Sequence, residues 1–174
     1  IIMKALDAGA LGIICPMINT PEDATSFVGA TKYAPLGYRS SGPTRAMMVH
    51  GSSYHDEAND NIISFAMIET VEALENVEKI ASTEGLTGIY IGPSDLSISM
   101  GYKPGLDRQE PEMIEAIKKI ENACKKNNIK VGIHCLSPSY LKEKLSSGYD
   151  LATLASDIRI YAEGIGNKLK EARS

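Results

Sequence analysis

Residues 62–95 read IISFAMIETVEALENVEKIASTEGLTGIYIGPSD. The two ends of this stretch, residues 62–68 and 88–91, are apolar, contain β-branched side chains and have the length of strands. Between them lies a segment with the apolar spacing of a helix, which begins after Thr70, a residue whose hydroxyl can cap a helix N-terminus. A strand, a helix and a second strand in this order predict two parallel strands joined by a right-handed crossover.

The same alternation continues along the rest of the chain. Further strand-length runs are predicted at residues 12–17, 130–134 and 151–154. Helices are predicted at residues 21–33, 71–82, 111–127, 138–146 and 158–172. Five strands that alternate with helices predict an α/β fold with a parallel sheet, either open or part of a barrel. A closed (β/α)8 barrel needs roughly 250 residues, so five such units cannot close one alone.

The composition is that of an ordinary soluble domain. The chain has 174 residues, of which 43% are hydrophobic and 23% charged, and this argues against disorder and against a membrane protein. A net charge of -4 offers no basic surface for nucleic acid or for anionic lipid. The expected partner is therefore a small molecule.

Cysteine usage bears on the cellular compartment. Cys15, Cys124 and Cys135 form no Cys-x-x-Cys pair, so the sequence predicts neither a disulfide framework nor a zinc site. Together with the lack of a secretory signal in residues 1–10, this favours a cytoplasmic protein. The chain begins at Ile1 within a segment of helical spacing and without a capping residue, which indicates a piece of a longer protein.

The longest irregular stretch is predicted at residues 34–60, which are rich in Gly, Pro, Ser and Asn. It carries Arg39, Arg45, His50 and His55. Two interpretations stay open, a solvated loop and a lid or subunit contact. No Gly-x-Gly-x-x-Gly motif follows a strand, so dinucleotide binding has no support.

Two carboxylates follow consecutive predicted strands, Glu69 after residues 62–68 and Asp95 after residues 88–91. In parallel α/β architecture ligands bind at the carboxyl ends of the strands, where these two side chains would meet. Two carboxylates brought together repel each other unless a cation lies between them, and a hard divalent metal suits oxygen ligands. The alternative is that Glu69 only favours the start of the following helix and Asp95 only caps a turn.

The turn at residues 92–97, Gly-Pro-Ser-Asp-Leu-Ser, could receive a substrate carboxylate on its backbone N–H groups, although it is also an ordinary strand-to-helix turn. His134 stands at another strand end, where a lone histidine is more often a structural group than a catalytic one. Cys15 and Cys135 lie within apolar strands and are expected to pack as small hydrophobic side chains.

Five segments, in this order and spacing, resemble the HpcH/HpaI aldolase family. They are ALDAGA at residues 5–10, GIICPM at 12–17, YAPLGYR at 33–39, MIET at 67–70 and IGPSDLS at 91–97. The resemblance implies a (β/α)8 TIM barrel of the phosphoenolpyruvate/pyruvate type, of which this chain would hold strands 4 to 8. It also implies a class II, metal-dependent aldehyde-lyase, a homo-oligomer, that cleaves a 4-hydroxy-2-oxo acid to pyruvate and an aldehyde through a metal-stabilised pyruvate enolate. Relatives of this type act on 4-hydroxy-2-oxoheptane-1,7-dioate or on 2-keto-3-deoxy sugar acids.

The resemblance also assigns residue roles. Glu69 and Asp95 match the family's ligands for Mg2+, Mn2+ or Co2+, and Ser94 with Asp95 matches the backbone that binds the pyruvate carboxylate. Asp7 matches the acid that supports the catalytic histidine. Met67 stands where the family often has a substrate-contacting glutamine, and a thioether cannot donate a hydrogen bond.

The family's catalytic histidine and its enolate-stabilising arginine lie on earlier strands than those found here. The resemblance therefore implies that residues 1–174 are a single domain, an incomplete barrel that lacks its N-terminal strands. It also implies a hexamer whose subunits exchange the last helix, residues 158–172. Two alternatives remain, a citrate-lyase-like or malyl-coenzyme A lyase, for which no basic cluster supplies a coenzyme A pocket, and a non-catalytic remnant that binds metal or a keto acid.

Overall fold

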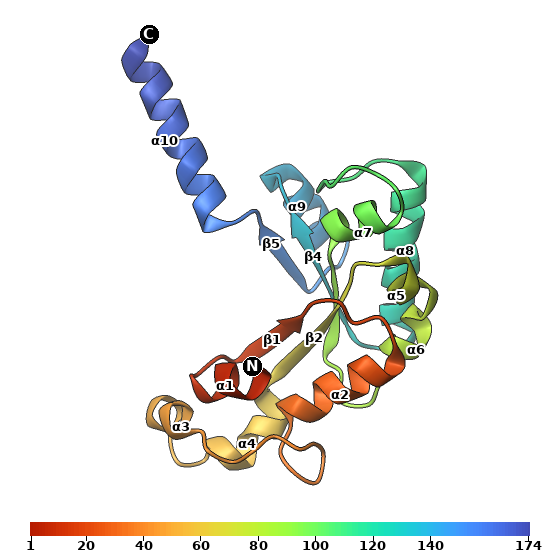
Figure 1. Ribbon diagram of the computed structural model, residues 1–174, viewed down its shortest axis with the longest axis vertical. Coiled ribbons are helices and arrows are strands. Elements are labelled where there is room, and N and C mark those ends of the chain that lie inside the picture. Colours follow the sequence, from red (N-terminus) through yellow and green to blue (C-terminus); the bar gives the residue numbers. More distant parts are fainter.

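The computed structural model describes all 174 residues and is built on one parallel sheet. Its five strands follow each other in chain order from β1 to β5. They are β1 (Gly12–Cys15), β2 (Ile63–Ile68), β3 (Gly88–Ile91), β4 (Lys130–Cys135) and β5 (Leu151–Leu154). Sequential order without a reversal is the arrangement of a barrel wall, whereas doubly wound open sheets reverse direction at a switch point. The sheet curls into half of a barrel, which confirms the predicted α/β fold and is consistent with a partial TIM barrel (Figure 1).

Helices connect and cover the strands. They are α1 (Ile2–Asp7), α2 (Pro21–Thr31), α3 (Thr44–His50), α4 (Tyr54–Asn61), α5 (Val71–Glu75), α6 (Val77–Ala81), α7 (Pro93–Ser99), α8 (Pro111–Lys126), α9 (Pro138–Ser146) and α10 (Asp157–Arg173). The helix starts use the expected capping chemistry, since Thr20, Thr70 and Ser137 each accept a backbone N–H through the side-chain hydroxyl.

Three local predictions differ from the structure. The helix predicted at residues 71–82 is divided into α5 and α6 at Asn76, whose side chain donates a hydrogen bond to the Asn19 carbonyl at 3.0 Å. The stretch at residues 34–60 is not wholly irregular, because it contains α3 and most of α4. The turn after β3 continues into the short helix α7, with Pro93 at its first position, where the missing N–H costs nothing.

The main hydrophobic core lies between the sheet and the helices that cover it. Ile68, Ile91 and Ile133, from three neighbouring strands, are completely buried in it together with Ile120 of α8. The exposed fraction of these side chains is 0%, so this layer fixes where each strand ends and therefore where the strand-end side chains lie.

The last helix, α10, behaves differently from the others. It extends away from the sheet, and none of its residues is buried (Figure 1). Its exposed apolar side chains include Ile158, Tyr161, Ile165 and Leu169, which recur at helical spacing. No helix of the structure has both the length and the apolar character required to cross a membrane.

Candidate metal and substrate site

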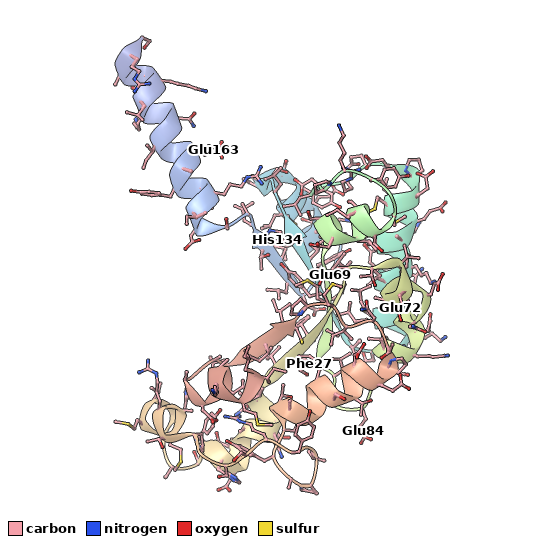
Figure 2. The ribbon with its side chains drawn as sticks, in the orientation of Figure 1. Phe27, Glu69, Glu72, Glu84, His134 and Glu163 are labelled. Carbon is pink, nitrogen blue, oxygen red and sulfur yellow. The ribbon has the colours of Figure 1, made fainter.

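Glu69 is a buried carboxylate at the end of β2, near the middle of the molecule (Figure 2). Only 5% of the residue is exposed. Its Oε1 accepts a hydrogen bond of 2.8 Å from the backbone N–H of Met17, which follows β1. Met17 adopts a left-handed backbone with φ of 56°, and this conformation belongs to the turn that directs its N–H at Glu69.

Gly92 leaves space for the other oxygen of Glu69. A Cβ atom at this position would lie 2.7 Å from Glu69 Oε2 and 2.9 Å from Glu69 Cβ. Any larger residue would displace the carboxylate from its place. The glycine therefore has a steric role beside the carboxylate, in addition to its place in the turn.

Asp95 lies in the first turn of α7, and its negative charge acts on Glu69. Burial raises the pKa of the Glu69 carboxyl, the hydrogen bond from Met17 lowers it, and the charge of Asp95 raises it further. The net pKa is raised, so the fold holds two carboxylates together at an electrostatic cost. A cation between them would remove this repulsion.

These two carboxylates line a cleft of about 280 Å3. Its nine lining residues come from the carboxyl-terminal parts of β2, β3 and β4, from the first turn of α7 and from the loop between α7 and α8: Met67, Glu69, Tyr90, Gly92, Pro93, Ser94, Asp95, Leu106 and His134. The structure thus brings together Glu69, Ser94 and Asp95, as the sequence predicted from their strand-end positions. No group of three or more His, Cys, Asp or Glu side chains gathers here or elsewhere in a way that could hold a metal. Two carboxylates leave most of the coordination positions of a divalent cation to water and substrate.

Three polar side chains on β3, β4 and β5 are hydrogen-bonded in series, and two of them, Tyr90 and His134, line the cleft. His134 Nδ1 lies 2.8 Å from Thr153 Oγ1, and the Tyr90 hydroxyl is hydrogen-bonded to the same oxygen. Burial lowers the pKa of His134, and the charge of Asp107 only partly opposes this. The imidazole is therefore neutral at pH 7.

Sequence reasoning singled out His134 but missed Tyr90 and Thr153. Thr153 is the register partner of His134 in the neighbouring strand, and Tyr90 pairs with Gly132. An added Cβ at Gly132 would lie 3.0 Å from Tyr90 Cδ2, so the small residue makes room for the ring. The one sequence signal for Tyr90 is its hydroxyl on an otherwise apolar strand. This signal does not identify the hydrogen-bond partner of the hydroxyl.

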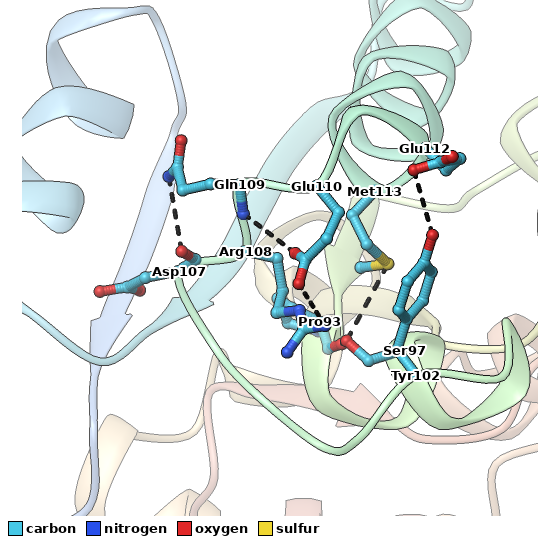
Figure 3. Close-up of polar contacts among 9 residues, drawn as sticks. All are labelled: Pro93, Ser97, Tyr102, Asp107, Arg108, Gln109, Glu110, Glu112 and Met113. Atoms are coloured by element: carbon cyan, nitrogen blue, oxygen red, sulfur yellow. Dashed lines mark hydrogen bonds and ion pairs between the residues drawn. The ribbon is translucent and has the colours of Figure 1, made fainter.

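The loop between α7 and α8 closes the cleft near Leu106 and is fastened by Asp107. Asp107 accepts hydrogen bonds from the N–H groups of Leu136 and Ser137, both at 2.8 Å, and from the Ser137 hydroxyl at 2.6 Å. The next residue, Arg108, is ion-paired with Glu110 at 2.7 Å (Figure 3). The loop is therefore attached to the turn that follows β4.

Asp7 is not among the residues that line the cleft. It lies at the end of α1 and forms an ion pair of 2.7 Å with Arg39. The Arg39 side chain is fully buried, with the rings of Tyr33 and Tyr54 within cation–π distance. The interpretation as a solvated loop is therefore wrong for Arg39. Its buried side chain connects residues 34–60 to α1 through the ion pair with Asp7.

Consecutive parallel strands with an acidic cleft at their carboxyl ends define the class of (β/α)-barrel enzymes. Residues 1–163 match the family described as HpcH/HpaI aldolase/citrate lyase, and the chain belongs to this family.

Relatives with known names agree with this. The chain is 39% identical over 173 residues to a hydroxypyruvate/pyruvate aldolase of Rhizorhabdus wittichii, covering 99% of this chain and 69% of the relative. It is 33% identical over 174 residues to a 2-keto-3-deoxy-L-rhamnonate aldolase of Salmonella paratyphi A, covering 97% of this chain and 64% of the relative. The chain therefore spans about two thirds of the length of these relatives. The comparisons confirm the expected family and the expected class of enzyme, a carbon–carbon lyase.

A solved structure gives the same result for the fold. A HpcH/HpaI aldolase/citrate lyase family protein from Burkholderia cenocepacia superposes with a TM-score of 0.86 at 28% identity, over 99% of this chain and 69% of the other. The five strands found here thus correspond to part of a barrel of that family.

Proposed function

We propose that this chain carries the metal-binding and pyruvate-binding part of a class II aldolase that cleaves 4-hydroxy-2-oxo acids to pyruvate and an aldehyde. The observation that carries the proposal is the buried Glu69 carboxylate, held beside Asp95 in a cleft at the strand ends. Support comes from the names of the relatives, which are pyruvate and keto-deoxy-sugar-acid aldolases.

Glu69 and Asp95 would hold Mg2+, Mn2+ or Co2+. The residues fit a hard divalent cation, because the donors are carboxylate oxygens and Gly92 leaves the Oε2 side of Glu69 open. Such a cation, when bound, supplies Lewis-acid stabilisation of the negative charge that develops on the keto oxygen of pyruvate. Met17 N–H fixes the rotamer of Glu69, so the carboxylate is in place before any ligand arrives.

The pyruvate carboxylate would bind at the turn that carries Ser94 and Asp95. Backbone N–H groups in the first turn of a helix have no helical partner, and Gly92 allows a close approach. Met67 and Leu106 are apolar side chains that line the same cleft. Because Met67 cannot donate a hydrogen bond, the backbone would have to orient the carboxylate by itself.

The remaining parts of the proposal follow from the resemblance. Asp7, held by Arg39, would orient the catalytic histidine, which would come from outside these 174 residues. Residues 1–174 would form one domain, namely strands 4 to 8 of the barrel. The enzyme would act in the cytoplasm as a hexamer, in which the apolar stripe of α10 packs on a neighbouring subunit.

Metal-dependent exchange of deuterium into the methyl group of pyruvate tests this function. We expect the protein with its whole barrel, which includes the strand that would carry the catalytic histidine, to exchange this methyl group when supplied with Mn2+ in D2O, and we expect Glu69→Gln or Asp95→Asn to reduce the rate at least a hundredfold. Glu84→Gln is the matched control, since Glu84 is an exposed carboxylate far from the cleft (Figure 2). Calorimetry with Mn2+ runs in parallel. Metal binding without exchange would identify a non-catalytic binding protein, and absence of both would overturn the proposal.

A further inference from the structure

The two hydrogen bonds that link Tyr90, Thr153 and His134 have a defined order of donor and acceptor. Thr153 Oγ1 contacts both the Tyr90 hydroxyl and His134 Nδ1, yet a threonine hydroxyl carries only one proton to donate. Thr153 Oγ1 could also accept from both neighbours, but its own proton would then have no acceptor, because Tyr90 and His134 are its only hydrogen-bond partners. Two orders give the Thr153 proton an acceptor. Either Tyr90 donates to Thr153 and Thr153 donates to Nδ1, or His134 donates to Thr153 and Thr153 donates to Tyr90.

The surroundings of Tyr90 favour the first order. Tyr90 is only 4% exposed, and Thr153 is its hydrogen-bond partner. In the second order the phenolic proton would lose that acceptor within a buried environment, which is costly. In the first order every member of the chain is satisfied, and the neutral imidazole carries its proton on Nε2.

The position of His134 makes its Nε2 proton available to a substrate bound in the cleft. His134 lines the cleft together with Glu69 and Asp95. In the proposed function the carboxylate and keto oxygens of the oxo acid are taken up by the Ser94–Asp95 turn and the metal. A donor on the β4 side of the cleft is left for the other half of the substrate, beside the apolar side chains of Met67 and Leu106.

We propose that His134 Nε2–H donates a hydrogen bond to an oxygen substituent on the aldehyde-derived half of the substrate, so that the enzyme prefers hydroxylated aldehydes to apolar ones. Tyr90 and Thr153 are positioning residues that fix the tautomer of His134. This inference rests on the proposed function, and it adds the chemical class of the aldehyde. Burial, which lowers the pKa of His134, keeps the imidazole neutral and so keeps a single donor in place.

Two aldehydes of nearly equal size test the preference. Glycolaldehyde and propanal differ in a hydroxyl against a methyl group, and both can be offered with pyruvate, in the direction of aldol addition, to the metal-loaded protein with its whole barrel. We expect the ratio of kcat/KM for glycolaldehyde to that for propanal to fall about tenfold in His134→Phe, which corresponds to one hydrogen bond. Thr153→Val, which keeps the shape of the side chain, should lower the ratio severalfold without changing Mn2+ affinity.

An unchanged ratio in His134→Phe would overturn the inference, and so would an equal loss for both aldehydes. A native protein that adds pyruvate to neither aldehyde would instead overturn the proposed function, and the tautomer can still be measured without activity. The chain has only three histidines, so the 15N resonances of His134 can be assigned as those lost in His134→Phe. We expect a protonated Nε2 and an unprotonated Nδ1 at neutral pH, and a mixture of tautomers in Thr153→Val. A protonated Nδ1 in the native protein would contradict the proposed direction of the chain.

Discussion

Glu69 is an ionisable side chain that the fold buries beside a second carboxylate. Burial and the charge of Asp95 both raise its pKa, and one hydrogen bond from Met17 opposes them. When an acid has a higher pKa in the folded chain than in the unfolded chain, its ionisation favours unfolding. The destabilisation is absent below the ordinary carboxyl pKa and complete once the pH has risen above the folded value.

We therefore expect Glu69→Gln to stabilise the metal-free protein at neutral pH. The amide oxygen can still accept the Met17 N–H, while the buried charge is removed. A gain of about 1 kcal/mol, or about 3 °C in Tm, is the expected size. Thermal unfolding in the presence of a chelator measures it at pH 7 and again at pH 4, where the difference should shrink. Glu84→Gln should show no such pH-dependent gain, and a lower Tm for Glu69→Gln at pH 7 would contradict the argument.

At the scale of elements, Asp107 connects the loop between α7 and α8 to the start of α9. Its two carboxylate oxygens accept three hydrogen bonds from Leu136 and Ser137. The loop carries Leu106 into the cleft, so the attachment fixes one wall of the site relative to β4.

We expect Asp107→Ala to lower the free energy of unfolding by about 2 kcal/mol, because it leaves these donors without a charged acceptor. Mn2+ affinity should stay unchanged, since Asp107 is not part of the carboxylate pair. Urea denaturation measures the first effect and calorimetry the second. Asp56→Ala is the control, because the Asp56 side chain is 87% exposed. Loss of metal binding would contradict this expectation. It would show that the loop holds Asp95 in position, in addition to the wall of the cleft that Leu106 forms.

The elements themselves were largely predictable from the sequence, and their side-chain partners were not. Apolar runs bounded by Gly, Pro and capping residues gave all five strands to within about two residues. The strand-end rule placed Glu69 and Asp95 in one cleft, although their role as metal ligands stays a prediction. The contact between Tyr90, Thr153 and His134 depends on the register of three strands, which no local pattern encodes.

At the scale of the whole molecule, α10 extends from the body without burying a residue. Ile158 and Tyr161 are 75% and 69% exposed, and Ile165 and Leu169 continue the same stripe. An apolar stripe of this kind is unusual on a helix that stays in water.

We expect the paired substitution Ile158→Glu and Ile165→Glu to lower the mass of the particle in solution without unfolding the sheet. The helix makes no buried contact with its own chain, so the substitutions cost little intramolecular packing. Light scattering measures the mass, and far-UV circular dichroism checks the fold. Glu163→Gln, on the same helix, is the control (Figure 2). An unchanged mass in the paired variant would exclude α10 as a subunit contact.

The isolation of α10 also has a consequence for amide hydrogen exchange. In a single subunit its N–H groups are protected only by the bonds of the helix itself, and a helix of 17 residues without tertiary support opens readily. Packing on another subunit would slow that opening, whereas the amides of β2 and β3 are already enclosed by the core. The exchange rate along α10 should then fall as the protein concentration rises, while the exchange rate in the central strands stays constant. The exchange rate of α10 would therefore measure the association of subunits.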